Sequence, residues 1–346
     1  VNSQDPYVPA KLIKDHGLRQ GLHMTAVLEP ARRGSGPCVA HLERIEGMPP
    51  SEYVLRPFES LTPLDPHVPL RLETGPEPLT TRVMDLFNPI GKGSRGLIVA
   101  PPRTGKTILL HEVANAVARN NPEMDIFLLL IDERPEEVTE LRRSFQGKEK
   151  VEVIASNNDQ DTASHIRIAE LVMDRAKRLA EMGRQVFVLL DSLTRLARAY
   201  NRGTQGSGRT LSGGVDSRAL EIPKRLFGSA RVFEEGGSIT VLGTALIETG
   251  SRMDDLIFQE FKGTGNMELV LNRKLADRRI FPALDVGQSG TRKEERLLDP
   301  EVLGKVRLLR RMLVDMDPVQ GMESFLKKLK SFPSNEEFLR GIKSPG

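Results

Sequence analysis

Five short apolar runs, separated by segments with helical periodicity, dominate the chain after residue 81. The runs cover residues 97–100, 126–131, 151–155, 186–190 and 239–246. In one intervening segment, ASHIRIAELVMDRAKRLAEM, the spacing places Ile166, Val172 and Leu179 on one face of a helix. Fully apolar strands that alternate with helices form parallel sheets covered by helices on both faces. The sequence therefore predicts an α/β fold with a parallel-rich sheet.

A proline-rich segment precedes this alternation. Residues 62–81 contain five prolines, which prevent a continuous helix or a central strand. Before them, GLHMTAVLEP and CVAHLERIEG are short strand-like runs bounded by glycine and proline. With 346 residues, the chain is long enough for two domains. We expect a small β module over residues 1–62, a linker over 63–81 and a large α/β domain over 82–346.

The segment GLIVAPPRTGKT carries the pattern of a phosphate-binding loop between a strand and a helix. Backbone N–H groups and the helix N-terminus would bind phosphate there, with Lys106 on the β and γ phosphates and the Thr107 hydroxyl on Mg²⁺. Ala100 replaces the usual first glycine, which is tolerable if that residue ends the strand. Gly105 is the position where a side chain would block the phosphate. The alternative is a chance Gly-Lys-Thr in an ordinary turn.

Two more strand ends carry carboxylates. In VFVLLDSLTRLARAY, Asp191 follows a buried strand, at the edge where open α/β sheets bind ligands. It could hold a Mg²⁺-bound water beside Thr107, or merely cap the next helix. In IFLLLIDERPEE, Glu133 could activate the attacking water and Arg134 could contact the γ-phosphate. The alternative for that segment is a solvated charge cluster.

Positive charge is concentrated between residues 192 and 231, where eight arginines and lysines face two acidic residues. This segment contains the glycine-rich stretch NRGTQGSGRTLSGGVD, and ETGSRMDD and FKGTGN repeat the pattern, with Arg252 and Lys262 as their charged tips. We predict a groove for a polyanion. Because the glycine-rich parts of these loops contain no aromatic residue, we expect contacts to the backbone and the 2′-hydroxyl rather than stacking on bases. Considered singly, each could be an ordinary surface loop.

A further arginine lies in RRIFPALDVGQSGTRKEE, where Arg292 follows Gly290 on a predicted loop. An arginine mounted in this way could reach a γ-phosphate bound to another subunit. The alternative is a surface ion pair with Glu294 or Glu295.

Several classes of protein are disfavoured by composition. A single cysteine, Cys38, excludes an internal disulfide, and no apolar run reaches the roughly 18 residues of a membrane span. No histidine or cysteine spacing resembles a metal site, so a metal would arrive with the nucleotide. We expect a reducing cytoplasm. Since VNSQDPYVPA has neither a signal pattern nor an initiator methionine, we expect the numbering to begin inside a longer chain.

Taken together, these segments closely resemble the Rho family of bacterial transcription termination factors, over nearly the whole chain. The segments that carry the resemblance are GLIVAPPRTGKT, LLIDERPEEVTE, LLDSLTRLARAYN, LSGGVDSRAL, EEGGSITVLGTALIETGSRMD, FKGTGNMEL and RRIFPALDVGQSGTRKEE. The resemblance implies a RecA-like P-loop ATPase domain that assembles as a homohexamer and acts as a 5′-to-3′ RNA–DNA helicase. It implies ATP and Mg²⁺ as cofactors. It also implies nascent, C-rich single-stranded RNA, the RNA polymerase elongation complex and a NusG-type elongation factor as partners, and no membrane.

The resemblance also implies roles for individual residues. Glu133 matches the catalytic carboxylate, Arg292 the finger that acts on the neighbouring subunit, and Arg134 and Arg279 the accessory arginines. Lys106 matches the phosphate-binding lysine, and Thr107 and Asp191 match the Mg²⁺ ligands. The nucleotide-binding set is Pro102, Arg103, Thr104, Gly105, Lys106, Thr107, Ile108 and Phe281, with Phe281 stacking on adenine. The RNA-binding set is Thr204, Gly206, Ser207, Gly208, Arg209, Thr210, Gly213, Gly214, Thr249, Gly250, Ser251, Arg252 and Lys262.

The chain departs from the family pattern at a few positions. Arg103, Thr104 and Arg252 stand where the family has lysine, alanine and lysine, whereas Ala100 agrees with the family. The resemblance further implies that the chain enters partway through the family's oligonucleotide-binding (OB) barrel, leaving a partial OB-like β module without the aromatic RNA platform. Two other functions stay open: a nucleic-acid-binding adaptor with a structural ATP site, and a subunit of a proton-coupled rotary ATPase.

Overall fold

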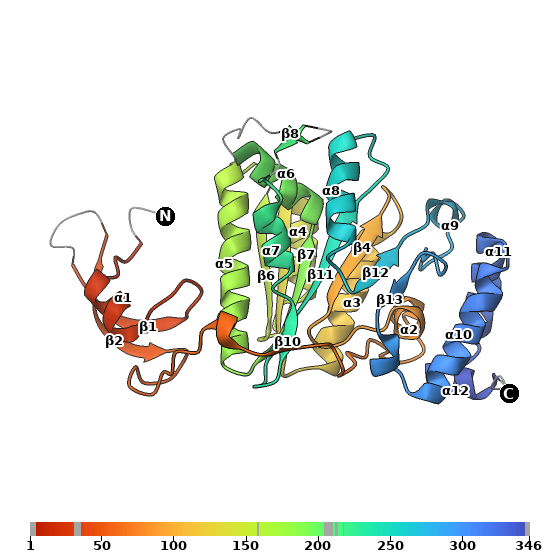
Figure 1. Cartoon of the computed structure of the whole chain (residues 1–346), viewed down its shortest axis with the longest axis horizontal. Helices are drawn as coiled ribbons and strands as arrows, with labels where there is room; N and C mark the ends of the chain where they lie inside the picture. The colour runs from red at the N-terminus through yellow and green to blue at the C-terminus, as the bar shows by residue number, and fades with distance from the viewer. Residues whose placement is uncertain are drawn as a thin grey trace.

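One mixed sheet organises most of the chain, as Figure 1 shows for the computed structural model. The structure describes residues 5–30, 36–157, 159–203, 210–211, 214–216 and 218–342. Within these residues the main path of the sheet runs β13-β12-β4-β11-β7-β5-β6, and β10 and β3 extend it beside β11. The strands are β3 Pro63–Leu64, β4 Arg95–Ala100, β5 Asp125–Glu133, β6 Val151–Asn157, β7 Gln185–Asp191, β10 Arg231–Phe233, β11 Ser238–Leu246, β12 Met267–Val270 and β13 Gly290–Thr291.

The predicted parallel sheet is confirmed. All five predicted runs are strands, and β6, β5, β7, β11, β4 and β12 pair in parallel. The short strands at the rim are antiparallel: β13 pairs with β12, and β10 pairs with both β11 and β3. Rim strands of two to four residues leave too short an apolar pattern to be recognised in the sequence.

Helices cover both faces of the sheet. Their bounds are α1 Ala10–His16, α2 Leu79–Phe87, α3 Lys106–Asn120, α4 Pro135–Ser144, α5 Thr162–Glu181, α6 Leu193–Gly203, α7 Glu221–Phe227, α8 Arg252–Lys262, α9 Arg273–Asp277, α10 Pro300–Val314, α11 Pro318–Lys330 and α12 Asn335–Arg340. Alternate residues of a strand point to opposite faces. In β4, Ile98 and Ala100 join the core under α2, α3, α10 and α11, whereas Leu97 and Val99 join the core under α5 to α8.

The N-terminal residues form a separate small layer beside α5 (Figure 1). Strands β1 Met24–Glu29 and β2 Cys38–Ile45 pair antiparallel, and α1 packs with them around Val39, Leu42 and Ile45. Arg19 of this layer donates hydrogen bonds of 2.8 and 2.7 Å to the carboxylate of Glu181, at the end of α5. The small layer is therefore attached to the sheet domain by a charged contact.

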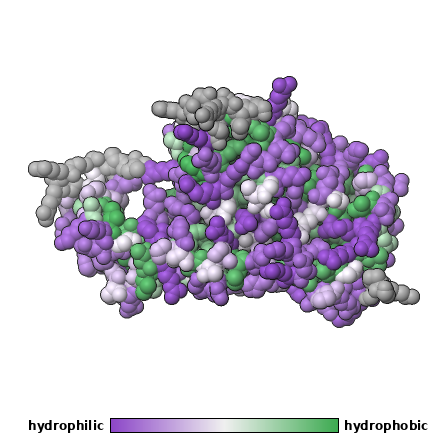
Figure 2. Space-filling model, viewed as in Figure 1, coloured by the Kyte–Doolittle hydropathy of each residue, from purple (hydrophilic) through white to green (hydrophobic). Residues whose placement is uncertain are grey.

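The proline-rich segment lies against the sheet domain. Leu70 and Leu72 are buried in the core on the α2 side, and α2 begins directly after Pro78. Figure 2 shows a mostly hydrophilic face with small scattered apolar patches. Within the part of the chain that the structure describes, no helix has the length and apolar character needed to cross a membrane.

Candidate active site

The phosphate-binding loop joins the carboxyl end of β4 to the first residue of α3. Alanine is expected to be tolerated in place of the usual first glycine if that residue ends the strand, and Ala100 is the last residue of β4. Gly105 adopts a φ of +83°, and a Cβ at this position would lie 3.0 Å from Cε1 of Phe281. Thr104 is buried, and its hydroxyl donates a 2.7 Å hydrogen bond to the carbonyl of Pro101, which closes the loop on itself. The positive φ favours glycine at 105, and a side chain there would also crowd the ring of Phe281.

The three strand ends singled out in the sequence meet beside this loop. The Lys106 ammonium forms an ion pair with Asp191 and lies 3.9 Å from Oε1 of Glu133. Asp191 ends β7 and Glu133 ends β5, and these two strands are neighbours in the sheet. The lining of one small cavity includes Thr107, Glu133, Asp191 and Glu137 of α4, together with six apolar side chains: Leu110, Ala114, Leu128, Leu130, Leu141 and Leu189. The tertiary structure therefore brings one hydroxyl and two carboxylates to the same opening.

Asp191 faces the cavity instead of capping a helix. Helix α6 begins at Leu193, and it is the Ser192 hydroxyl that accepts a 3.1 Å hydrogen bond from the backbone N–H of Arg195. The Asp191 carboxylate accepts a 2.6 Å hydrogen bond from the Thr244 hydroxyl, on the adjacent strand β11. The Thr244 contact and the ion pair with Lys106 direct its oxygens toward the loop.

Glu133 is buried and held by two cations. Its side chain contacts Lys106 on one side, and on the other its Oε2 lies 3.1 Å from Nη1 of Arg195. Burial and the negative charge of Asp191 together raise the pKa of Glu133 to about 7, and the positive charges of Lys106 and Arg195 only partly oppose this shift. A carboxylate that is 4% exposed is not a member of a solvated charge cluster. Arg134, by contrast, is exposed at the residue before α4.

These groups fit the predicted magnesium and nucleotide site. Hydroxyl and carboxylate oxygens are the ligands that Mg²⁺ takes from proteins, usually together with substrate phosphates. Among the described residues there is no group of three or more His, Cys, Asp or Glu side chains that could hold a metal ion by themselves. The donor set at Thr107 and Asp191 therefore suits a cation that is shared with a phosphate.

Apolar side chains flank the phosphate-binding loop. Ile108 on α3 is 63% exposed, and Phe281 is 41% exposed although its ring lies against Gly105. Arg279, two residues before Phe281, is exposed and adopts a φ of +60°. The structure thus places Phe281 beside the loop, at a position open to a planar ligand.

Arg292 lies at the opposite end of β4 from the loop. Thr291 is opposite Met267 in the β13–β12 pair, and Met267 is opposite Gly96 near the start of β4. At about 3.3 Å per residue, the four steps from Gly96 to Ala100 span roughly 13 Å. Glu294 pairs with Arg307 at 3.3 Å, and within the described part of the chain no ion pair joins Arg292 to Glu294 or Glu295. Arg292 is therefore distant from the loop of its own chain.

The basic loops are described in part. The predicted RNA contacts Thr204, Gly206, Ser207, Gly208, Arg209 and Gly213 lie outside the described residues. Thr210 begins β8, Thr210–Leu211, which pairs with β9, Val215–Asp216. Gly214 has a φ of +78°, and its carbonyl accepts a 3.2 Å hydrogen bond from the Asn201 amide.

The second loop joins the end of β11 to α8. Thr249 and Gly250 are exposed, and Arg252 is exposed at the first residue of the helix. Ser251 immediately precedes the helix and is half-buried. Lys262, at the other end of α8, lies 4.0 Å from Glu268. Arg252 and Lys262 are thus at opposite ends of one helix and not in one cluster.

Sequence reasoning missed two residues of this site. Arg195 entered only as one member of the basic segment, although it contacts Glu133, and Thr244 was not considered. The position of Arg195, four residues after Asp191, is a signal that could have been used, since it puts the side chain one helical turn beyond the strand end. No local signal marks Thr244, which lies in the middle of an apolar strand.

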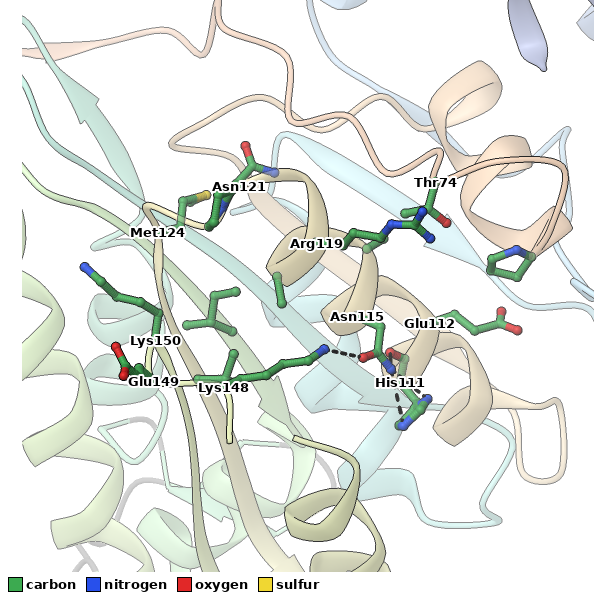
Figure 3. A pocket seen from close by; sticks show the side chains of 16 residues that line it. Thr74, His111, Glu112, Asn115, Arg119, Asn121, Met124, Lys148, Glu149 and Lys150 are labelled. Atoms are coloured by element: carbon green, nitrogen blue, oxygen red, sulfur yellow. Dashed lines mark hydrogen bonds between the residues drawn. The ribbon is translucent and has the colours of Figure 1, made fainter. Parts of the chain in front are cut away.

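A cavity of about 820 Å³ lies near the far end of α3, and Figure 3 shows its lining. His111 and Asn115 of α3 lie near the Lys148 ammonium, which donates a 2.8 Å hydrogen bond to Asn115, whereas the Arg119 side chain points toward Thr74. None of the predicted site residues is among those that line this cavity. The predicted nucleotide-binding residues and this cavity are therefore separate.

The chain matches known families over most of its length. The nucleotide-binding domain of the ATP synthase alpha/beta family matches residues 80–291. The transcription termination factor Rho of Streptomyces lividans is 55% identical over 340 residues, covering 97% of this chain and 48% of that protein. Rho of Aquifex aeolicus is 50% identical over 342 residues, covering 98% of this chain and 78% of that protein. The chain spans about half the length of several of the curated relatives it matches.

A solved structure supports the fold. An ATPase from the type III secretion system of pathogenic bacteria superposes with a TM-score of 0.68 at 22% identity, covering 90% of this chain and 92% of that chain. At this identity the likeness establishes the fold alone. The predicted RecA-like P-loop fold is confirmed. The OB-like character of the N-terminal module and the division of the chain at residues 62 and 81 stay predictions.

Proposed function

The chain belongs to the Rho family of transcription termination factors, and we propose that it is an RNA-dependent ATPase that moves along nascent RNA and terminates transcription. The observation that carries this proposal is the meeting of Thr107, Glu133 and Asp191 around one cavity beside the phosphate-binding loop. A site that only held a nucleotide for structural reasons would not require a buried carboxylate at the position of Glu133.

Each group at the cavity has a role in the proposed hydrolysis. Lys106 binds the β and γ phosphates, and Thr107 and Asp191 hold Mg²⁺, which would neutralise the charge on the phosphates. Glu133 in its ionised form accepts a proton from the attacking water. Because Arg195 contacts Glu133 from the side away from Lys106, it fixes the direction in which the carboxylate points.

Other residues act across a subunit interface in this proposal. Arg292 is too far from the loop of its own chain, which supports its use by a neighbouring subunit of a homohexamer. Arg134 and Arg279 are accessory arginines on the exposed side of the site. Pro102, Arg103, Thr104 and Gly105 supply backbone donors to the phosphates, and Ile108 and Phe281 enclose the adenine.

The two basic loops contact RNA in this proposal. Arg252, Lys262 and the glycine-rich residues of both loops would bind the backbone of single-stranded RNA. The N-terminal module would contribute to binding, with a preference for C-rich RNA. The RNA polymerase elongation complex and a NusG-type elongation factor are the proposed partners. A factor that acts on nascent bacterial RNA works in the cytoplasm, which is where we propose that this chain acts.

Steady-state ATP hydrolysis by the purified chain tests the proposal. Hydrolysis is measured in a titration with C-rich RNA and, separately, with mixed-sequence RNA and with DNA of equal length. We expect strong stimulation by RNA and little by DNA. Nucleotide binding without hydrolysis on any polymer would contradict the motor and favour an adaptor with a structural nucleotide site. RNA-independent hydrolysis would favour the rotary type of subunit, whose nucleotide-binding domain belongs to the family model matched here.

A further inference from the structure

Helix α6 links the nucleotide site to the second basic loop. It begins two residues after Asp191 and carries Arg195 and Arg198 three residues apart, on the same face. Arg195 contacts Glu133, whereas Arg198 reaches Asp254, on the first turn of α8. The two arginines therefore connect one rigid helix to both sites.

Arg198 makes a bidentate contact with Asp254, and the Asp254 carboxylate is buried. Nε of Arg198 donates a 2.8 Å hydrogen bond to Oδ1 of Asp254, and Nη2 donates one of 2.5 Å to Oδ2. Asp254 is fully buried, with 0% of its surface exposed. A planar guanidinium that meets a carboxylate with two parallel bonds fixes orientation as well as distance. The start of α8 is thus held in one orientation relative to α6.

The same carboxylate organises the loop. The Thr249 hydroxyl donates a 2.6 Å hydrogen bond to Oδ2 of Asp254 and accepts one of 3.3 Å from the backbone N–H of Ser251. At the other end of the loop, the hydroxyl of Thr194 on α6 accepts a 2.9 Å hydrogen bond from the N–H of Leu246. Helix α6 therefore holds the loop where it leaves β11 and where it enters α8.

We infer that Arg198 is a positioning residue for the RNA-contacting loop over residues 247–252. The inference rests on the proposed function. Arg198 positions Thr249 and Arg252 through its contact with Asp254. Because Arg198 lies on α6, it also links the position of this loop to the carboxylates at the nucleotide site. Arg198 itself touches neither RNA nor nucleotide. Its loss changes how RNA binds and stimulates hydrolysis, and leaves nucleotide binding intact.

The test compares three variants of the whole chain. Arg198→Met removes the ion pair but keeps a long apolar stem, and Arg198→Lys keeps the charge but not the two parallel bonds. Arg184→Met is the matched control, because Arg184 lies outside the basic segment and pairs with Asp125 at the start of β5, at the opposite end of the sheet from the loop. For each variant we measure the RNA concentration that gives half-maximal stimulation of ATP hydrolysis, the dissociation constant for ATP, and hydrogen exchange of the backbone over 247–255.

Arg198→Met is expected to raise the half-stimulating RNA concentration by at least about fivefold, with the dissociation constant for ATP within about twofold of the parent. Arg198→Lys should recover part of the loss. Backbone hydrogen exchange over residues 247–255 should be faster in Arg198→Met than in the parent, whereas hydrogen exchange over α5 should be unchanged. Arg184→Met should match the parent in all three measurements.

Two results would overturn the inference. In one, the RNA titrations of Arg198→Met and the parent coincide. In the other, Arg184→Met shows the same defect, which would mean that the loss of any comparable ion pair has this effect. If the parent itself were not stimulated by RNA, the proposed function would fail, but hydrogen exchange would still decide whether Arg198 positions the loop. Unchanged exchange over 247–255 would show that it does not.

Discussion

The ammonium nitrogen of Lys106 lies 3.9 Å from Oε1 of Glu133, and the same ammonium forms an ion pair with Asp191. One cation from the phosphate-binding loop thus bridges two carboxylates on neighbouring strands. Lys106 and Arg195 stabilise the charged form of Glu133, yet burial and the charge of Asp191 outweigh them and raise its pKa to about 7. The protonation state of Glu133 is therefore sensitive to small changes around neutral pH.

We expect kcat/KM for ATP hydrolysis to rise as the pH increases through about 7, because Glu133 must be ionised to accept a proton. The stability of the fold is expected to change in the opposite direction. Because the pKa of Glu133 is raised in the folded chain, the folded chain binds this proton more tightly than the unfolded chain does. The contribution of Glu133 to the free energy of unfolding therefore falls as the pH rises from the ordinary pKa of 4.5 to about 7. A pH–rate profile checks the first point, with Glu140→Gln, at an exposed position of α4, as the control that keeps the rise. A flat profile would contradict the role of Glu133.

Removal of a proposed Mg²⁺ ligand should change the dependence on metal. Thr107→Ala is expected to raise the half-saturating Mg²⁺ concentration by at least about 10-fold, and Asp191→Asn should do the same. Thr107→Ser keeps the hydroxyl and should stay close to the parent. The measurement is ATP hydrolysis over a Mg²⁺ titration. Equal Mg²⁺ dependence in Thr107→Ala and Thr107→Ser would remove Thr107 from the metal site.

The distance between Arg292 and its own loop predicts complementation between subunits. Arg292→Ala alone should lose about 10³-fold in hydrolysis, and Lys106→Ala alone should be inactive. Mixed rings should recover activity, because some interfaces then combine an intact arginine from one subunit with an intact loop from the next. Co-assembly is verified by differential tags. Absence of recovery in proven mixed rings, at every ratio, would argue against action across the interface.

Arg252→Ala should weaken RNA binding about equally for all sequences. If Arg252 contacts a phosphate, the slope of log K against log salt should decrease in magnitude by about one unit. The exposed Arg143 on α4 provides a control, since Arg143→Ala should leave the slope unchanged. The check is a salt series of RNA dissociation constants. A loss confined to some sequences, with an unchanged slope, would place Arg252 on a base.

Glu181 should be important for the stability of the contact between the N-terminal layer and α5. Its buried carboxylate accepts hydrogen bonds from Arg19 and from the backbone N–H of Phe58 at 2.7 Å, and it pairs with Arg178 at 2.9 Å. Glu181→Ala leaves these donors without a partner and is expected to lower the free energy of unfolding by about 3 to 5 kcal/mol.

Glu235→Ala is the comparison for Glu181→Ala, because Glu235 bonds Thr62 in the same region but is exposed. It should lower the free energy of unfolding by much less than Glu181→Ala does, because an exposed carboxylate is already solvated. Urea unfolding followed by circular dichroism measures both variants. Equal losses in the two variants would show that burial of Glu181 adds nothing to the contact.

Local patterns were sufficient for much of this protein. Each apolar run of four to eight residues predicts a strand because its side chains must be buried on both faces, and all five such runs are strands. The phosphate-binding loop is likewise local, since the positive φ of Gly105 and the start of α3 at Lys106 depend on consecutive residues. Asp191 and Glu133 could be singled out because ligands bind at the carboxyl ends of parallel strands.

Which side chains meet was decided by the order of the strands and the packing of the helices. Asp191 contacts Thr244, 53 residues away, and Arg198 contacts Asp254, 56 residues away. Arg19 meets Glu181 across 162 residues. The spacing of apolar residues does not predict such pairs, because it indicates only whether a residue faces a core. The strands, the loop and the residue types at the strand ends follow from the local order of residues, because each depends on neighbours in the chain. That Arg195 faces Glu133, and that α6 joins the candidate site to the second basic loop, follows only from how the strands and helices pack.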